Sequence, residues 1–127
     1  MTQQKLVLID YQNIQNLAGL RQLGKSIVCE VFLGVNQKLS GEQLHEFEFA
    51  TTRWNLVKQQ GKNAADMLIV LKLGQLLDDF NEIYIVSKDR DFDSIVAFVS
   101  AKPNKLIKRI ENFAKTNFHV SSKAVKK

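Results

Sequence analysis

Short runs of apolar residues alternate along the chain with longer stretches in which apolar and polar positions follow a helical period. The runs at 5–10, "KLVLID", and 26–34, "SIVCEVFLG", are nearly continuous in apolar or β-branched residues and predict strands buried on both faces. A strong strand is also predicted at 82–87, "EIYIVS", and a weaker one at 55–58, "NLVK". These four strands define the expected sheet.

Helices are predicted between and after the strands. In chain order, the helical stretches are 13–23, 40–53, 63–79, 91–101 and 105–118. The last has Leu106, Ile110 and Phe113 on one face and lysines on the other, and Pro103 is a candidate hinge before it. The β-α-β-α order implies right-handed crossovers. We therefore expect a three-layer α/β/α domain with a mostly parallel sheet of four to five strands.

Composition fits one globular domain, because 127 residues with 45% hydrophobic and 24% charged side chains suffice for one buried core. Cys29, the single cysteine, lies inside an apolar run, which excludes a disulfide framework and favours a reducing compartment. The longest apolar stretch, "MLIVLKLGQLL", is short and contains Lys72, and the N-terminus lacks the features of a leader. A cytoplasmic protein without a membrane span is expected.

The net charge of +5 is unevenly distributed. Residues 102–127 contain eight Lys or Arg and one acid, whereas the rest contains ten basic and twelve acidic residues. This division predicts a domain at 1–101, followed at 102–127 by a basic helix and tail packed on or extending it. A basic end suggests contact with a polyanion such as nucleic acid, and a solvated tail has the same composition.

Aspartates from three parts of the chain are predicted to meet at one edge of the sheet. Asp10 ends the first strand, Asp89 and Asp91 follow Ser87 at the end of the fourth, and Asp66 lies in the first turn of the helix after the third. The carboxyl ends of parallel strands open on one edge, where ligands bind. Each acid alone is explained as a helix cap or a first-turn acid. Together they exceed what capping requires.

Such a cluster suits Mg²⁺ or Mn²⁺, which prefer carboxylate and water oxygens. The ion would stabilise charge on phosphoryl oxygens and lower the pKa of a bound water, which points to phosphodiester hydrolysis. His45 and His119 have no partners at metal-ligand spacing, so zinc does not fit. The sequence also has no nucleophile-elbow, Walker or dinucleotide-binding pattern.

Three segments, "LIDYQNI", "GKNAADMLIVLKLG" and "IVSKDRDFDSIV", together resemble the NYN branch of PIN-like nucleases over roughly residues 5–100. The resemblance implies a compact α/β fold and divalent-metal-dependent ribonuclease activity, often on structured RNA or tRNA or as a toxin-like effector. The positions that match its metal-site acids are Asp10, Asp66, Asp89 and Asp91. Asn13 matches the residue that positions them, and Ser87 is their neighbour. Asp93 has no firm counterpart and is interpreted as a helix cap, and Lys88 stands where the family often has glycine.

Basic residues near these segments are candidates to hold the RNA backbone. They are Lys62, Lys88, Arg90, Lys105, Lys108 and Arg109. The last three belong to the helix expected at 105–118, where they would form a basic face.

The leading hypothesis is an endoribonuclease that uses Mg²⁺ or Mn²⁺. One alternative is an inactive RNA- or protein-binding module, in which Lys88 pairs with Asp89 in place of the metal. Another is a receiver-like signalling domain, although Leu8 and Ile9 stand before Asp10, where an acid pair is usual. A homodimer is compatible with the sequence and is not required by it.

Overall fold

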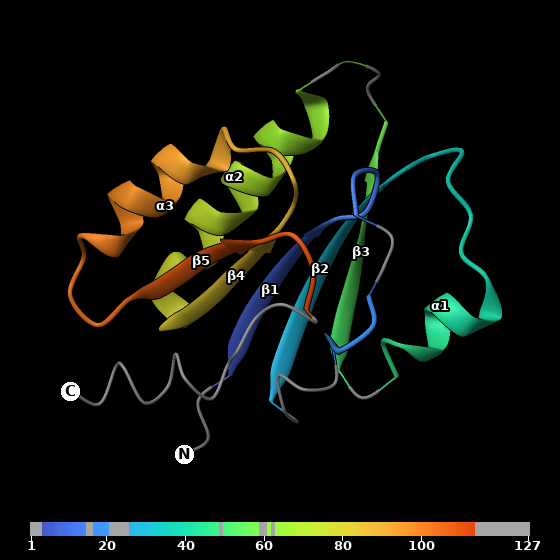
Figure 1. The fold of residues 1–127 in the computed structure, drawn as a ribbon, viewed down its shortest axis with the longest axis horizontal. Coiled ribbons are helices and arrows are strands. Elements are labelled where there is room, and N and C mark those ends of the chain that lie inside the picture. The colour runs from blue at the N-terminus through green and yellow to red at the C-terminus, as the bar shows by residue number, and fades with distance from the viewer. Residues whose placement is uncertain are drawn as a thin grey trace.

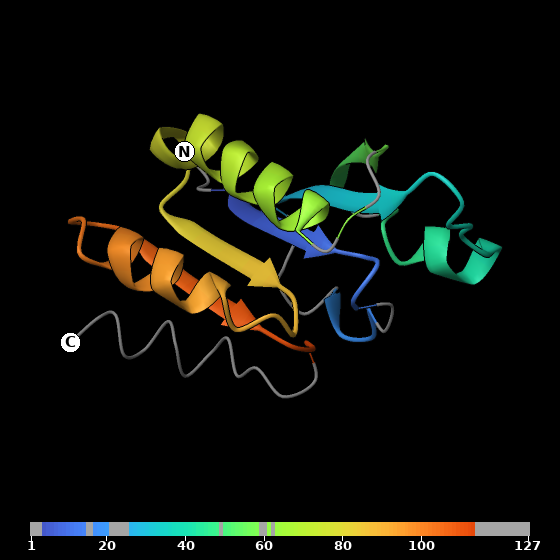
Figure 2. The same ribbon diagram turned by 90° about the horizontal axis from the view of Figure 1, so that it is seen from above.

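The computed structural model describes residues 4–14, 17–20, 26–48, 50–58, 61 and 63–113. Its strands are β1 (Lys5–Asp10), β2 (Ile27–Gly34), β3 (Thr51–Val57), β4 (Glu82–Val86) and β5 (Leu106–Ile110). They form one parallel sheet in the order β3-β2-β1-β4-β5 (Figure 1). The arrows of β1, β4 and β5 point the same way in Figure 2. The predicted parallel sheet is confirmed, with five strands.

The helices are α1 (Gly41–His45), α2 (Ala64–Leu76) with the short 3₁₀ turn η2 (Leu77–Asp79), and α3 (Phe92–Ser100). Ile69 of α2 and Phe92 of α3 pack against Leu8 and Ile85 on one face of the sheet. Phe47, which follows α1, and residues of the turn after β1 pack on the opposite face. The sheet is thus the middle of three layers. Within the described ranges, no helix has the length and apolar character needed to cross a membrane.

The strand order makes β1 the strand from which the chain's connections run in opposite directions across the sheet. The chain leaves β1 for β2 and β3 on one side, then returns through α2 to β4 and β5 on the other. At such a point the two connecting loops separate and leave a crevice beyond the carboxyl ends of the strands. The strand order places this point between the ends of β1 and β4, where a ligand site is expected.

Four predicted elements are wrong in type or extent. Residues 106–110 form β5 and not part of a helix over 105–118, of which 114–118 lie outside the described residues. The helix expected at 40–53 ends at His45, and the strand expected at 55–58 begins at Thr51. The described residues of 13–23 form turns and no α-helix. Both misread strands lie at the edges of the sheet, where side-chain patterns are weakest and pairing decides the structure.

One carboxylate lies inside the sheet. Glu30 of β2 is fully buried. Its Oε2 accepts a hydrogen bond from Arg53 Nη1 at 3.2 Å, and its Oε1 accepts one from Asn55 Nδ2 at 3.0 Å, both from β3. Lys72 Nζ of α2 lies 4.0 Å from Oε1. Glu30 therefore joins β2 to edge strand β3 and to α2.

We expect Glu30→Ala to lower the free energy of unfolding by about 2 kcal/mol, because it removes charge-assisted hydrogen bonds and leaves a small void. Urea unfolding followed by circular dichroism measures the change. Glu42→Ala, at an exposed position of α1, is the control and should shift the free energy by less than about 0.5 kcal/mol. Equal stability of both variants would show that the Glu30 contacts contribute nothing to the sheet.

Candidate metal centre

A single hydroxyl group joins the ends of β1 and β4. Ser87 Oγ donates a hydrogen bond to Asp10 Oδ2 at 2.9 Å and accepts one from the backbone N–H of Asp89 at 3.1 Å. Asn13 Nδ2 lies within hydrogen-bonding distance of the same oxygen, at 3.5 Å. Asp10 and Ser87 are 3% and 0% exposed, so their geometry is fixed by packing. The predicted roles of Ser87 and Asn13 beside Asp10 have a geometric basis here, although their function stays a prediction.

The acids that follow β4 are not used as helix caps. Asp91 is the N-cap residue of α3, but its side chain makes no capping hydrogen bond. Its backbone N–H donates instead to Asp89 Oδ1 at 2.9 Å, which orients the Asp89 carboxylate. Asn63, the N-cap residue of α2, likewise makes no side-chain cap, so Asp66 in the first turn is not part of a capping box. Capping therefore does not account for these carboxylates.

Asp66, Asp89 and Asp91 converge. Each offers one carboxylate oxygen, and these oxygens all lie within 4.8 Å of one another. Three hard oxygen donors at this separation fit a small divalent cation that keeps several of its waters. Asp10 is not part of this group and lies beside it, behind Ser87. Three of the four predicted acids are thus brought together as an acidic cluster, with the fourth adjacent.

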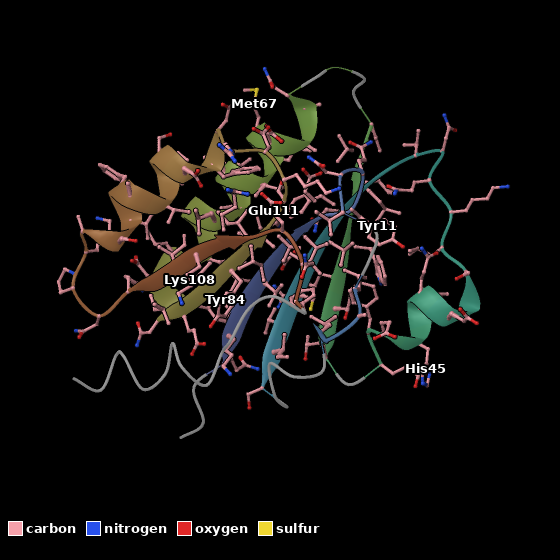
Figure 3. The ribbon with its side chains drawn as sticks, viewed as in Figure 1. Tyr11, His45, Met67, Tyr84, Lys108 and Glu111 are labelled. Carbon is pink, nitrogen blue, oxygen red and sulfur yellow. The ribbon has the colours of Figure 1, made fainter. Side chains whose placement is uncertain are left out.

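A groove of about 420 Å³ between α2 and α3 opens beside the acidic cluster. Asp66 and Asp91 form part of its wall, together with the apolar side chains of Met67 and Ile95. Figure 3 shows Met67 at the N-terminal end of α2, where its side chain is 71% exposed. The carboxylates are therefore reached from solvent across an apolar rim.

Repulsion within the cluster changes its protonation. Burial, a hydrogen bond with Asp89 and the charges of the neighbouring acids raise the pKa of Asp66 to about 7. The hydrogen bond from Asp66 and the backbone N–H of Asp91 lower the pKa of Asp89. Asp66 therefore keeps its proton more readily than Asp89, because two adjacent carboxylates do not both ionise readily.

Burial and hydrogen bonding act in opposite directions on the pKa of Asp10. Burial raises its pKa, and the hydrogen bonds from Ser87 and Asn13 lower it, with a smaller upward contribution from Asp89. The net direction is upward. The charge of Asp89 reaches Asp10 and that of Asp10 reaches Asp66, so the four acids form one electrostatic unit.

Arg109 of β5 forms hydrogen bonds with three groups at the carboxyl ends of β4 and β5 and the start of α3. Its Nε donates to Asp93 Oδ1 at 2.7 Å, and its Nη1 donates to the Ser87 carbonyl at 3.0 Å and to Glu111 Oε2 at 3.2 Å. Asp93 lies in the first turn of α3 and pairs with Arg109, so its interpretation as a helix cap is wrong, because Asp91 occupies the N-cap position. No local pattern predicts the contact between Arg109 and Ser87, because this contact depends on β5 lying next to β4.

The other predicted RNA-binding residues are dispersed. Lys88 and Arg90 are exposed in the loop that carries Asp89 and Asp91. Lys105 precedes β5 at the opposite edge, where its Nζ donates to the carbonyls of Leu77 and Phe80. Lys108 lies midway along β5, paired in register with Tyr84 (Figure 3). Lys62 lies outside the described residues.

Of the two histidines, His45 is among the described residues. It lies on α1, far from Met67 in Figure 3, and its Nδ1 lies 3.0 Å from Glu48 Oε2. His119 lies outside the described residues.

A family model described as PIN domain matches residues 4–109. The matched segment contains all four predicted acids and runs from before β1 into β5. The match is to the PIN domain in general and does not distinguish the NYN branch. No curated protein and no solved structure matches the chain.

The raised pKa of Asp66 predicts a pH-dependent stability in chelating buffer. The Asp66 carboxyl keeps its proton in the folded protein at pH values where it has already lost it in the unfolded chain. The contribution of this proton to the free energy of unfolding is therefore complete below about pH 4 and is lost as the pH rises to about 7. We expect Asp66→Asn to raise the free energy of unfolding by about 1 kcal/mol at about pH 8, with a smaller gain at about pH 5, because solvent screens this partly exposed group. Urea unfolding at both pH values measures the difference.

Asp79→Asn, in the exposed turn η2, is the matched control and should change stability by less than about 0.5 kcal/mol at either pH. A loss of stability in Asp66→Asn at about pH 8 would contradict the repulsion inferred for the acidic cluster.

Proposed function

Since the chain belongs to the PIN domain family, we propose that it is a divalent-metal-dependent endoribonuclease of the NYN branch. The observation that supports this most strongly is the convergence of Asp66, Asp89 and Asp91 beside the buried pair of Asp10 and Ser87. The chemistry is hydrolysis of an RNA phosphodiester bond.

The acidic cluster would hold Mg²⁺ or Mn²⁺. Bound there, either ion supplies charge stabilisation to phosphoryl oxygens and lowers the pKa of a coordinated water. Asp89 is oriented for this role by the backbone N–H of Asp91, and Asp10 by the Ser87 hydroxyl. Ser87 is a positioning residue, because its oxygen is enclosed by Asp10, Asn13 and the Asp89 backbone.

Lys88 and Arg90 would contact phosphates on either side of the scissile bond, since both are exposed within the loop that carries the acids. Lys108, midway along β5, would add a weaker contact farther away, and Lys62 stays a candidate from the sequence. Lys105 and Arg109 are already engaged by the protein's own carbonyls and acids, so we assign them to positioning the strand ends. Backbone contacts of this kind carry little sequence information and weaken with salt.

The main alternative is a binding module that lost turnover, in which Lys88 would neutralise Asp89. Among the ion pairs of the described residues, none joins these two side chains. We also propose a cytoplasmic location, because Cys29 is a buried thiol whose pKa is raised to about 12 by burial and by Glu30, which suits an unreactive core residue.

The purified protein should cut a fluorescently labelled RNA in the presence of Mn²⁺ and should not cut it in excess chelator. Asp89→Asn should lower the rate at least about a hundredfold, because it removes the negative charge and replaces one ligand oxygen with an NH₂ group that cannot bind a cation. Gel analysis of the products over time measures both.

Asp79→Asn makes the same chemical change away from the cluster and should cut at the wild-type rate. Cutting that persists in chelator and in Asp89→Asn would come from a contaminating nuclease and would refute the proposal. RNA binding without cutting under any condition would favour the binding module.

Metal binding should also be visible without RNA. At about 100 times its Kd, Mn²⁺ should stabilise the folded state by about 2.7 kcal/mol, which corresponds to a rise of about 10 °C in Tm for a chain of this size. Asp89→Asn should lose most of this rise and Asp79→Asn should keep it, as measured by differential scanning fluorimetry. An equal rise in all three proteins would place the metal elsewhere.

A further inference from the structure

The two edge strands of the sheet differ in how they are protected against pairing with another chain. β5 is five residues long and carries Lys108 and Arg109. β3 is seven residues long and contains no proline, and its single charged side chain, Arg53, is bound to Glu30 inside the sheet. Short length, proline and charged side chains are among the features that keep an edge strand from binding a further strand. β5 has two of these features, and β3 has none of them.

The outer side of β3 offers backbone groups for such pairing. In the strand order β3 pairs with β2, and within the described residues no strand lies beyond it (Figure 1). The backbone N–H and C=O groups of a strand alternate between its two sides, so half of those in β3 point away from β2. An extended segment of another chain can form hydrogen bonds with these groups without rearranging the sheet.

A groove of about 500 Å³ lies between β3 and α2. Leu68 and Leu71 of α2 line it and are 38% and 58% exposed. Apolar side chains that stay exposed together at one place indicate a surface that contacts another molecule. The groove therefore supplies apolar contacts next to the outer side of β3.

The opposite face of β3 is apolar as well. The Trp54 ring packs edge-on against Phe47, with 5.1 Å between the ring centroids, and Phe47 belongs to the core on the side of α1. Leu56, two residues farther along the strand, points to the same face and is exposed. Alternate side chains of an added strand would contact Trp54 and Leu56 on this face and the two leucines of α2 on the other. Apolar β-branched residues suit both faces.

The charge of the groove is positive. Lys58, which follows β3, and Lys72 of α2 both line it. Lys72 lies near the buried Glu30, which also pairs with Arg53, so two cations there offset one carboxylate. Lys58 takes part in none of the ion pairs between described residues. The groove thus favours acidic side chains at the end of a bound strand.

From these features we infer that β3 binds an extended segment of a partner protein, which adds to the sheet as a further strand with apolar β-branched residues at its centre and acidic residues at its ends. Backbone hydrogen bonds with β3 supply affinity, and the groove and Lys58 supply specificity for the side chains. An RNA strand is acidic but has no apolar side chains for the leucines of α2. The inference does not depend on the proposed hydrolysis.

A synthetic peptide tests this inference. Its centre alternates valine and threonine, its ends are glutamates, and fluorescence anisotropy of an attached fluorescein measures binding. The wild-type protein should bind it saturably with a Kd below about 1 mM, and no saturable binding in this range would overturn the inference.

Leu71→Glu should weaken peptide binding at least about tenfold, because it removes apolar contact and repels the glutamates. Lys58→Glu should weaken it about threefold at low salt. Phe98→Glu and Lys102→Glu make the same chemical changes at exposed positions of α3 and the turn after it, outside the groove. Both controls should bind within about twofold of the wild-type protein. Circular dichroism confirms that each variant is folded, and equal losses in variants and controls would overturn the groove as the site.

Backbone pairing is tested by N-methylation of the peptide. One peptide is methylated on its odd central residues and another on its even ones, because only every second N–H of an added strand faces β3. One of the two should lose at least about tenfold in affinity and the other should stay within about threefold of the parent peptide. Equal affinities of the two methylated peptides would overturn strand addition.

Two further results would assign the surface to another occupant and overturn the inference. The first is a dimer of the wild-type protein in sedimentation velocity that Leu71→Glu dissociates, which would identify a second copy of this chain as the occupant. The second is a fluorescein-labelled RNA decamer whose binding is lost in Leu71→Glu while peptide binding is unaffected.

Discussion

The parallel direction of all five strands decides where the chemistry of this chain gathers. Each carboxyl end opens on one edge of the sheet, and β1, at its centre, is flanked by β2 and β4. Asp10 and Ser87 therefore meet although they are distant in sequence, and the 2.9 Å bond between them fixes the point from which the other acids are arranged. The acidic cluster lies beside this bond and depends on the connections that diverge at β1.

The same convergence concentrates negative charge, and the protein relieves it only in part. Ser87 donates to Asp10, and Arg109 pairs with Asp93 and Glu111 nearby. The cluster still raises the pKa of Asp66 to about 7. Such an arrangement lowers the stability of the free protein and favours binding of a cation, because an ion removes repulsion that the fold leaves in place. The same arrangement of carboxylates thus lowers the stability of the metal-free protein and raises its affinity for a divalent cation.

The sequence predicts the buried elements well and the edge strands poorly. β1, β2 and β4 have continuous apolar runs because both faces are covered, and α2 and α3 begin and end close to the predicted positions. In β5, Leu106 and Ile110 lie four positions apart, a spacing that fits a helix as well as an irregular edge strand. Pairing with β4 decides between them, and no local pattern carries that information. Thr51–Val57 is misread for the same reason, because only Val57 is buried in β3.

The wrong secondary structure predicted at 105–118 affects the basic residues expected at the site and not its acids. The rule for strand ends placed Asp10, Asp66, Asp89 and Asp91 at one edge, and the structure brings the last three together. The basic face expected on a C-terminal helix is wrong, because neighbouring side chains in a strand point to opposite faces of the sheet. Arg109 therefore reaches Ser87 and Asp93 while Lys108 points to the other face. A sequence pattern can identify the chemistry at a strand end, but which side chains of neighbouring strands meet there follows from the topology.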